Sequence, residues 1–165
     1  MPLSDVHGQG RACESLLRAL VSKRLHHAYL FAGPQGVGKA LAARGIAQAM
    51  LCHDSRPDGD GCGQCNVCLR VAEGQHADVH VIQRKGGSDG RTDRHIKIDQ
   101  VRALQKALSY KAFEGHRRVV LVYEAEKMTA STANAMLKTL EEPGQATHFV
   151  LVTDSAHRLL PTIIS

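Results

Sequence analysis

A glycine-rich turn between an apolar run and a helix-forming run constrains the fold more than any other stretch of this 165-residue sequence. Residues 28–40 read AYLFAGPQGVGKA, so an apolar run enters the turn and a helix-forming run, residues 40–52, leaves it. The pattern G-x-x-x-x-G-K is typical of a P-loop, in which backbone N–H groups and a helix N-terminus surround phosphate oxygens. The predicted phosphate cradle consists of Gly33, Pro34, Gln35, Gly36, Val37, Gly38 and Lys39.

Two positions depart from the pattern of a P-loop that hydrolyses ATP. Such loops place Ser or Thr after the lysine, because the hydroxyl ligates Mg²⁺, but this chain has Ala40. They also place a metal-binding acid at the end of a neighbouring strand, where the apolar run 119–123 ends in Tyr123. Glu124 follows Tyr123, and three interpretations of it remain open. It is a glutamate that activates water, an ordinary charged loop residue or, if the strand is aligned one residue later, the metal-binding acid. The two departures argue against ATP with Mg²⁺ as a cofactor and against catalysis by this chain.

Four of the five cysteines lie within seventeen residues of one another, directly after the helix-forming run. Cys52, Cys62, Cys65 and Cys68 have the spacing C-x9-C-x2-C-x2-C. Short C-x2-C turns bring two sulfurs to one ion, and zinc prefers four thiolates in a tetrahedron, so we predict a structural Zn²⁺ site. Disulfides and an iron–sulfur cluster are the alternatives. We call residues 52–68 the cysteine module.

Strand-like and helix-like runs alternate along the chain. Apolar runs of strand length occupy residues 29–32, 79–83, 119–123 and 148–153, and helical spacing occurs in residues 11–24, 40–52, 67–73, 99–108 and 130–140. Asp99 and Thr129 are expected N-caps, Pro143 an expected helix stop, and residues 161–164 a short closing helix. The polar, glycine-rich residues 84–95 are expected to be a linker. This alternation predicts one doubly wound α/β domain over residues 1–165, with a parallel sheet.

Composition excludes some classes of protein. With 43% hydrophobic and 22% charged residues the chain is typical of a soluble domain. It has no membrane-length apolar run and no signal-peptide pattern, so we expect a cytoplasmic protein. The net charge of +5 fits nucleic-acid or acidic partners as well as a merely basic surface. Six aromatic residues argue against a base-stacking platform.

Several stretches are similar to a known family of replication proteins. These are residues 26–39, the cysteines inserted after the P-loop helix, and residues 96–105, 124–143 and 159–165. Together they resemble the AAA+ domain of the clamp-loader subunits of bacterial DNA polymerase III, and among these most the delta-prime subunits. The match covers nearly the whole chain.

The resemblance implies a three-layer α/β/α P-loop NTPase (AAA+) fold with an inserted zinc-binding module. It implies a non-hydrolysing subunit that helps to load the sliding clamp on primed DNA. The implied partners are the gamma/tau and delta subunits and, through the complex, the clamp and primer–template DNA, without a membrane. Thr153 would take the sensor position for the terminal phosphate. Ser165 would begin the Ser-Arg-Cys motif whose arginine reaches a neighbouring ATP site, and the lid and collar domains would lie outside this chain.

Two other functions remain open from the sequence. An ATP-hydrolysing gamma/tau-like subunit would be similar in sequence but would keep a hydroxyl in place of Ala40 and an acid in place of Tyr123. A zinc-dependent nucleic-acid binder unrelated to replication would leave the P-loop unexplained.

Overall fold

A single parallel sheet organises the fold. The computed structural model describes residues 2–6, 8, 10–86, 90–114, 117–144 and 146–159. In this part of the chain four strands pair in the order β1-β4-β3-β2. The strands are β1 (Ala28–Ala32), β2 (Val79–Ile82), β3 (Arg118–Val122) and β4 (Thr147–Thr153). The helices are α1 (Gly10–Val21), α2 (Lys39–Leu51), α3 (Asn66–Ala72), α4 (Ile98–Leu108) and α5 (Ala130–Glu141), with 3-10 turns η1 (Leu3–Asp5), η2 (Ala125–Lys127) and η3 (Ala156–Arg158).

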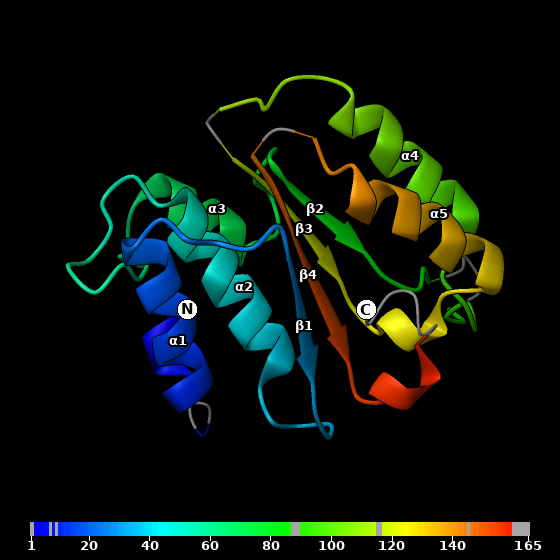
Figure 1. The fold of residues 1–165 in the computed structure, drawn as a ribbon, viewed down its shortest axis with the longest axis horizontal. Helices are drawn as coiled ribbons and strands as arrows, with labels where there is room; N and C mark the ends of the chain where they lie inside the picture. Colours follow the sequence, from blue (N-terminus) through cyan, green and yellow to red (C-terminus); the bar gives the residue numbers. More distant parts are fainter. Residues whose placement is uncertain are drawn as a thin grey trace.

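Helices cover both faces of the sheet (Figure 1). Val119 and Leu121 of β3 face the core formed with α1, α2 and α3, whereas Val120 and Val122 face the core formed with α4 and α5. All five residues of β3 are buried, as expected for a central strand with an apolar core on each side. The three-layer α/β/α architecture with a parallel sheet is therefore confirmed.

Most predicted boundaries agree with the structure to within one or two residues. Thr129 is the N-cap of α5, where its side chain accepts a hydrogen bond from the Thr132 N–H. The expectation for Asp99 was wrong: α4 begins one residue earlier, Lys97 is its N-cap, and Asp99 lies in the first turn. A carboxylate in the first turn still stabilises the helix, because it lies near the positive end of the helix dipole. The predicted closing helix, residues 161–164, lies outside the described residues.

The carboxyl ends of the strands meet at one edge of the sheet, the lower edge in Figure 1. The P-loop follows β1 there, Tyr123 and Glu124 follow β3, and Asp154 follows β4. Open parallel sheets bind ligands at this edge, so a binding site is expected here. None of the helices in the described residues is both long and apolar enough to cross a bilayer.

Candidate functional site

The lysine of the P-loop forms hydrogen bonds with carbonyl groups of the same loop. Gly36 and Gly38 have φ of 81° and 86°, a region that favours glycine, and these turns lead the chain from β1 into α2. Lys39 is the first residue of α2, and its Nζ donates to the carbonyl oxygens of Gly33 and Pro34, at 2.6 Å each. The ammonium charge is therefore satisfied inside the loop, and a phosphate would have to draw it away from two carbonyls.

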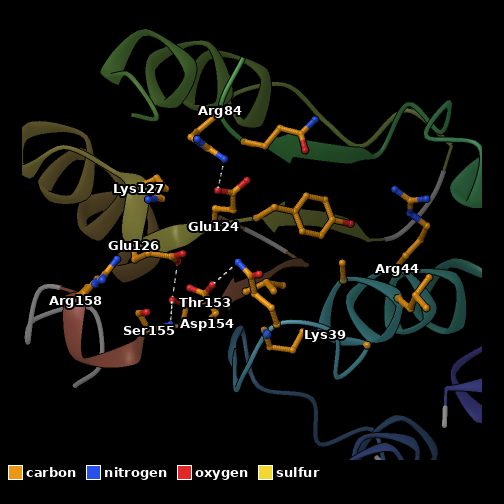
Figure 2. Close-up of a pocket in the computed structure, with 18 residues that line it drawn as sticks. Lys39, Arg44, Arg84, Glu124, Glu126, Lys127, Thr153, Asp154, Ser155 and Arg158 are labelled. Atoms are coloured by element: carbon orange, nitrogen blue, oxygen red, sulfur yellow. Dashed lines mark hydrogen bonds and ion pairs between the residues drawn. The ribbon is translucent and has the colours of Figure 1, made fainter. Parts of the chain in front are cut away.

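A cleft of about 870 Å³ separates the P-loop from the ends of β3 and β4 (Figure 2). Cationic and anionic side chains both line it. They are Lys39, Arg44, Arg84, Lys127 and Arg158 against Glu124, Glu126 and Asp154. Five cations against three carboxylates give this cleft an excess positive charge among the described lining residues, which suits an anionic ligand.

Two residues of the cleft are those for which the sequence predicts the loss of the magnesium ligands of a hydrolytic P-loop. Ala40 presents a methyl group at the start of α2, and Tyr123 follows the last residue of β3. Burial raises the pKa of the Tyr123 phenol, and the nearby Arg44 guanidinium opposes this only in part. The phenol oxygen is buried and has no hydrogen-bond partner of normal geometry among the described residues. A neutral, buried phenol is a poor ligand for a hard cation that prefers carboxylates and water.

Each acid at the edge of the cleft is already engaged by a neighbour (Figure 2). Glu124, in the left-handed region with φ of 51°, forms an ion pair with Arg84 at 2.7 Å. Glu126 Oε2 accepts a 2.7 Å hydrogen bond from the Thr153 hydroxyl, which is at the predicted sensor position. Asp154 accepts a 3.0 Å hydrogen bond from the Gln35 amide of the P-loop. A metal ion recruited here would have to compete with these interactions.

The four cysteines of the cysteine module converge, as predicted. Their sulfur atoms all lie within 4.8 Å of one another, and the sulfurs of Cys52 and Cys65 are 3.8 Å apart. A tetrahedral zinc with Zn–S bonds of about 2.3 Å holds its sulfurs roughly 3.8 Å apart, so the cluster has the right size. All four thiols are free rather than paired in disulfides, and Cys13 is buried in α1, away from the cluster.

Backbone N–H groups point at the cluster's sulfur atoms. Cys62 Sγ accepts from Gln64 N at 3.4 Å and from Cys65 N at 3.2 Å, and these bonds lower the pKa of the Cys62 thiol to about 7. The sulfurs of Cys52 and Cys65 accept backbone hydrogen bonds as well. Burial raises the pKa of Cys52 and Cys68. Thiolates are the form that zinc binds, so a donor set directed at the sulfurs fits a metal centre.

Some cleft residues gave no signal in the sequence. Arg84 lies at the start of a segment whose composition predicts a linker, and Arg44 lies inside a helix. The pairing of Arg84 with Glu124 joins positions 40 residues apart, and the Gln35–Asp154 hydrogen bond joins positions 119 residues apart. Only the order of the strands brings these residues to one edge.

A parallel sheet with a P-loop after its first strand and a cleft at the strand ends defines a P-loop protein of the AAA+ class. Two solved structures share this arrangement, both from Thermotoga maritima. A DNA polymerase III gamma-subunit-related protein has a TM-score of 0.59 and 25% identity, over 92% of this chain and 42% of that chain. The RuvB Holliday junction branch migration motor has a TM-score of 0.59 over 98% of this chain and 44% of that chain. At 19% identity, RuvB supports the fold alone.

Sequence relatives narrow the class to one family. The family model described as "DNA polymerase III, delta subunit" matches residues 8–165, and the chain belongs to this family. The delta-prime subunit of Bacillus subtilis (strain 168) is 39% identical over 95% of this chain, and that of Pseudomonas aeruginosa 41% identical over 84%. The tau subunit of Bacillus subtilis is 35% identical over 98%. The chain spans 45%, 40% and 27% of the lengths of these three relatives.

Proposed function

We propose that this chain belongs to a non-hydrolysing, delta-prime-like subunit of the DNA polymerase III clamp loader, which helps to load the sliding clamp on primed DNA. The family match and the identity to two delta-prime subunits support the assignment to this machine. The proposed partners are the gamma/tau and delta subunits and, through the assembled complex, the clamp and primer–template DNA. The cytoplasmic location stays a prediction.

The observation that carries the proposal is the pair of side chains at the magnesium positions of the cleft. Phosphoryl transfer in P-loop proteins depends on Mg²⁺ held by the hydroxyl after the lysine and by an acid on a neighbouring strand. This chain offers the methyl group of Ala40 and the neutral phenol of Tyr123. Glu124, the nearest substitute for the acid, is held by Arg84 at 2.7 Å. The cleft thus keeps the cradle and its lysine while it lacks the oxygens that bind the metal.

A gamma/tau-like ATPase is the second candidate. The intact P-loop lysine and the match to the tau subunit over 98% of the chain favour it. Titration of the chain with labelled ATP, with and without Mg²⁺, separates the two functions. We expect weak binding that does not depend on Mg²⁺. Micromolar binding that requires Mg²⁺ would support the ATPase and contradict the proposal.

We infer that Cys52, Cys62, Cys65 and Cys68 together hold one structural Zn²⁺ ion. Four protein ligands close the coordination sphere, so the metal would stabilise the cysteine module rather than bind a substrate. Metal analysis of the purified chain is expected to give one zinc per chain. Iron in place of zinc, two zinc ions or none would each contradict this assignment.

A further inference from the structure

The N-terminal residues of the chain run along the P-loop helix from its middle, at Gly45, to its N-cap, Gly38. We call residues 2–6 the strap. At one end Pro2 lies against Gly63 of the cysteine module, where an added Cβ would come within 3.0 Å of the proline ring. In the middle Leu3 is fully buried against Gly45 of α2, with its Cα 3.0 Å from the position of a Cβ there. The strap therefore lies too close to α2 for a larger residue at Gly45.

The strap ends at the P-loop. Val6 is 6% exposed, and its Cγ1 lies 3.3 Å from the position that a Cβ on Gly38 would take. Gly38 is the N-cap of α2 and one of the two P-loop glycines with positive φ. The strap thus buttresses the turn that presents Lys39 to the cleft.

A buried carboxylate of the cysteine module holds the middle of the strap by hydrogen bonds. Asp60 is completely buried, and its Oδ1 accepts from Leu3 N at 3.0 Å and from Gly61 N at 2.8 Å. Its Oδ2 accepts from Ser4 N at 2.8 Å. Leu3 and Ser4 open η1, where N–H groups lack partners within the helix, so Asp60 caps this turn from 57 residues away. The Arg56 guanidinium adds a 3.2 Å hydrogen bond to the Ser4 hydroxyl.

The strap and Asp60 stabilise each other. A buried carboxylate is tolerated only when N–H donors or cations satisfy it. Among the described residues Asp60 has three donors, and two of them come from the strap. Without the strap the carboxylate would lose the hydrogen bonds from Leu3 and Ser4. Without a fixed Asp60, the strap would lose the cap of its only turn.

The position of Asp60 depends in turn on the cysteine module. Asp60 lies in the loop that Cys52 and Cys62 close, and these two sulfurs belong to the convergent cluster. On the other side, Gln48 of α2 is 1% exposed, and its Nε2 donates to the Cys68 carbonyl at 2.8 Å. A metal that joins the four sulfurs would therefore fix the loop, and Asp60 with it, against α2.

We propose that Asp60 is a positioning residue through which the metal-loaded cysteine module fixes the strap and, through the strap, the P-loop. The metal link rests on the zinc site proposed above, whereas the hydrogen bonds from the strap to Asp60 do not. The module would thus act on a cleft that none of its own residues lines.

Amide hydrogen exchange of the zinc-loaded chain tests the proposal. The variant Asp60→Asn keeps the size of the side chain but replaces one of the two accepting oxygens with an NH₂ group, which cannot accept a hydrogen bond. One uncharged oxygen would then face three N–H donors. We expect amides of residues 3–4 to exchange at least about tenfold faster, with a smaller increase at residues 36–38, while β3 is unchanged and one zinc is retained. The matched control is Asp54→Asn in the same module, because the exposed Asp54 carboxylate makes no ion pair or hydrogen bond within the described residues. It should leave all rates unchanged.

Two results would overturn the proposal. Unchanged exchange of the strap in zinc-loaded Asp60→Asn would remove the role of Asp60, and an equal rise in strap and β3 would indicate a merely structural residue. The wild-type chain gives a second test that needs no variant: chelation of zinc must release the strap before β3. If the strap stays protected after chelation, the metal link is wrong. A chain that never binds zinc also overturns the zinc proposal, while the Asp60→Asn comparison still decides the role of Asp60.

Discussion

Replacing Cys68 with alanine is expected to remove stoichiometric zinc from the chain and to unfold the cysteine module locally. Cys68 is fully buried at the first turn of α3 and belongs to the four-sulfur cluster. Changes to groups that merely support metal ligands weaken binding by about 10- to 100-fold, so loss of a ligand should weaken it by roughly 100-fold or more. Metal analysis after gel filtration measures the loss.

The structural effect follows from how little else holds the module. Among the described residues 52–72, the buried apolar side chains are Val67, Cys68 and Val71. Structural zinc in small peptides supplies about 10–16 kcal/mol of binding free energy, which is also folding free energy. We expect hydrogen exchange over residues 52–72 to rise sharply, while β3 keeps its protection.

Cys13→Ala is the matched control for Cys68→Ala. Cys13 is a cysteine of similar burial, at 6% exposed, but it lies in α1 outside the cluster. Its truncation leaves a small cavity that costs on the order of 1 kcal/mol of stability, and zinc should stay at one per chain. If Cys68→Ala retained a full equivalent of zinc, the four-thiolate site would be contradicted.

The double variant Ala40→Ser, Tyr123→Asp is expected to gain nucleotide affinity that depends on Mg²⁺. The serine would supply the hydroxyl at the start of α2, and the aspartate would supply a carboxylate after β3. We expect ATP to bind at least about tenfold more tightly with Mg²⁺ than it binds the wild-type chain, which corresponds to roughly 1.4 kcal/mol. Isothermal titration with Mg²⁺ and again with EDTA measures the gain and its dependence on the metal.

The control for this gain is Ala40→Ser combined with Tyr123→Phe. Phenylalanine keeps the half-buried ring, which packs against the core of α1, α2 and α3, but it offers no carboxylate. This variant should therefore show no gain that requires Mg²⁺. If the folded Ser/Asp variant showed none either, the defect would lie elsewhere in the cleft, for example in the hold of Gly33 and Pro34 on Lys39.

Local signals in the sequence were sufficient for the layers of the fold and for the convergence of the four cysteines. Apolar runs such as residues 119–123 identify strands because a central strand must be apolar on both faces, and β3 is buried throughout. The C-x2-C spacing predicts a cluster of cysteines because it brings the sulfurs of one short segment together, and the four cysteines do converge. Some helix limits were misjudged: α4 begins one residue before Asp99, and α1 ends at Val21 rather than at residue 24.

The contacts that could not be predicted join distant parts of the chain. No pattern around Arg84 indicates its partner Glu124, and no pattern around Asp60 indicates Leu3 and Ser4. These side chains meet because the sheet order and the packing of α2 bring their backbones together. The hydrogen bonds from Lys39 to two loop carbonyls could not be predicted either. The same P-loop sequence also accommodates a lysine that faces a phosphate.

We propose that this chain does not hydrolyse ATP. Steady-state release of phosphate from ATP with Mg²⁺, measured for the wild-type chain beside Lys39→Ala, tests it most directly. A contaminating ATPase would contribute equally to both preparations, so the difference between them belongs to the P-loop. We predict no difference. Sustained turnover by the wild-type chain that Lys39→Ala lacks would contradict the account.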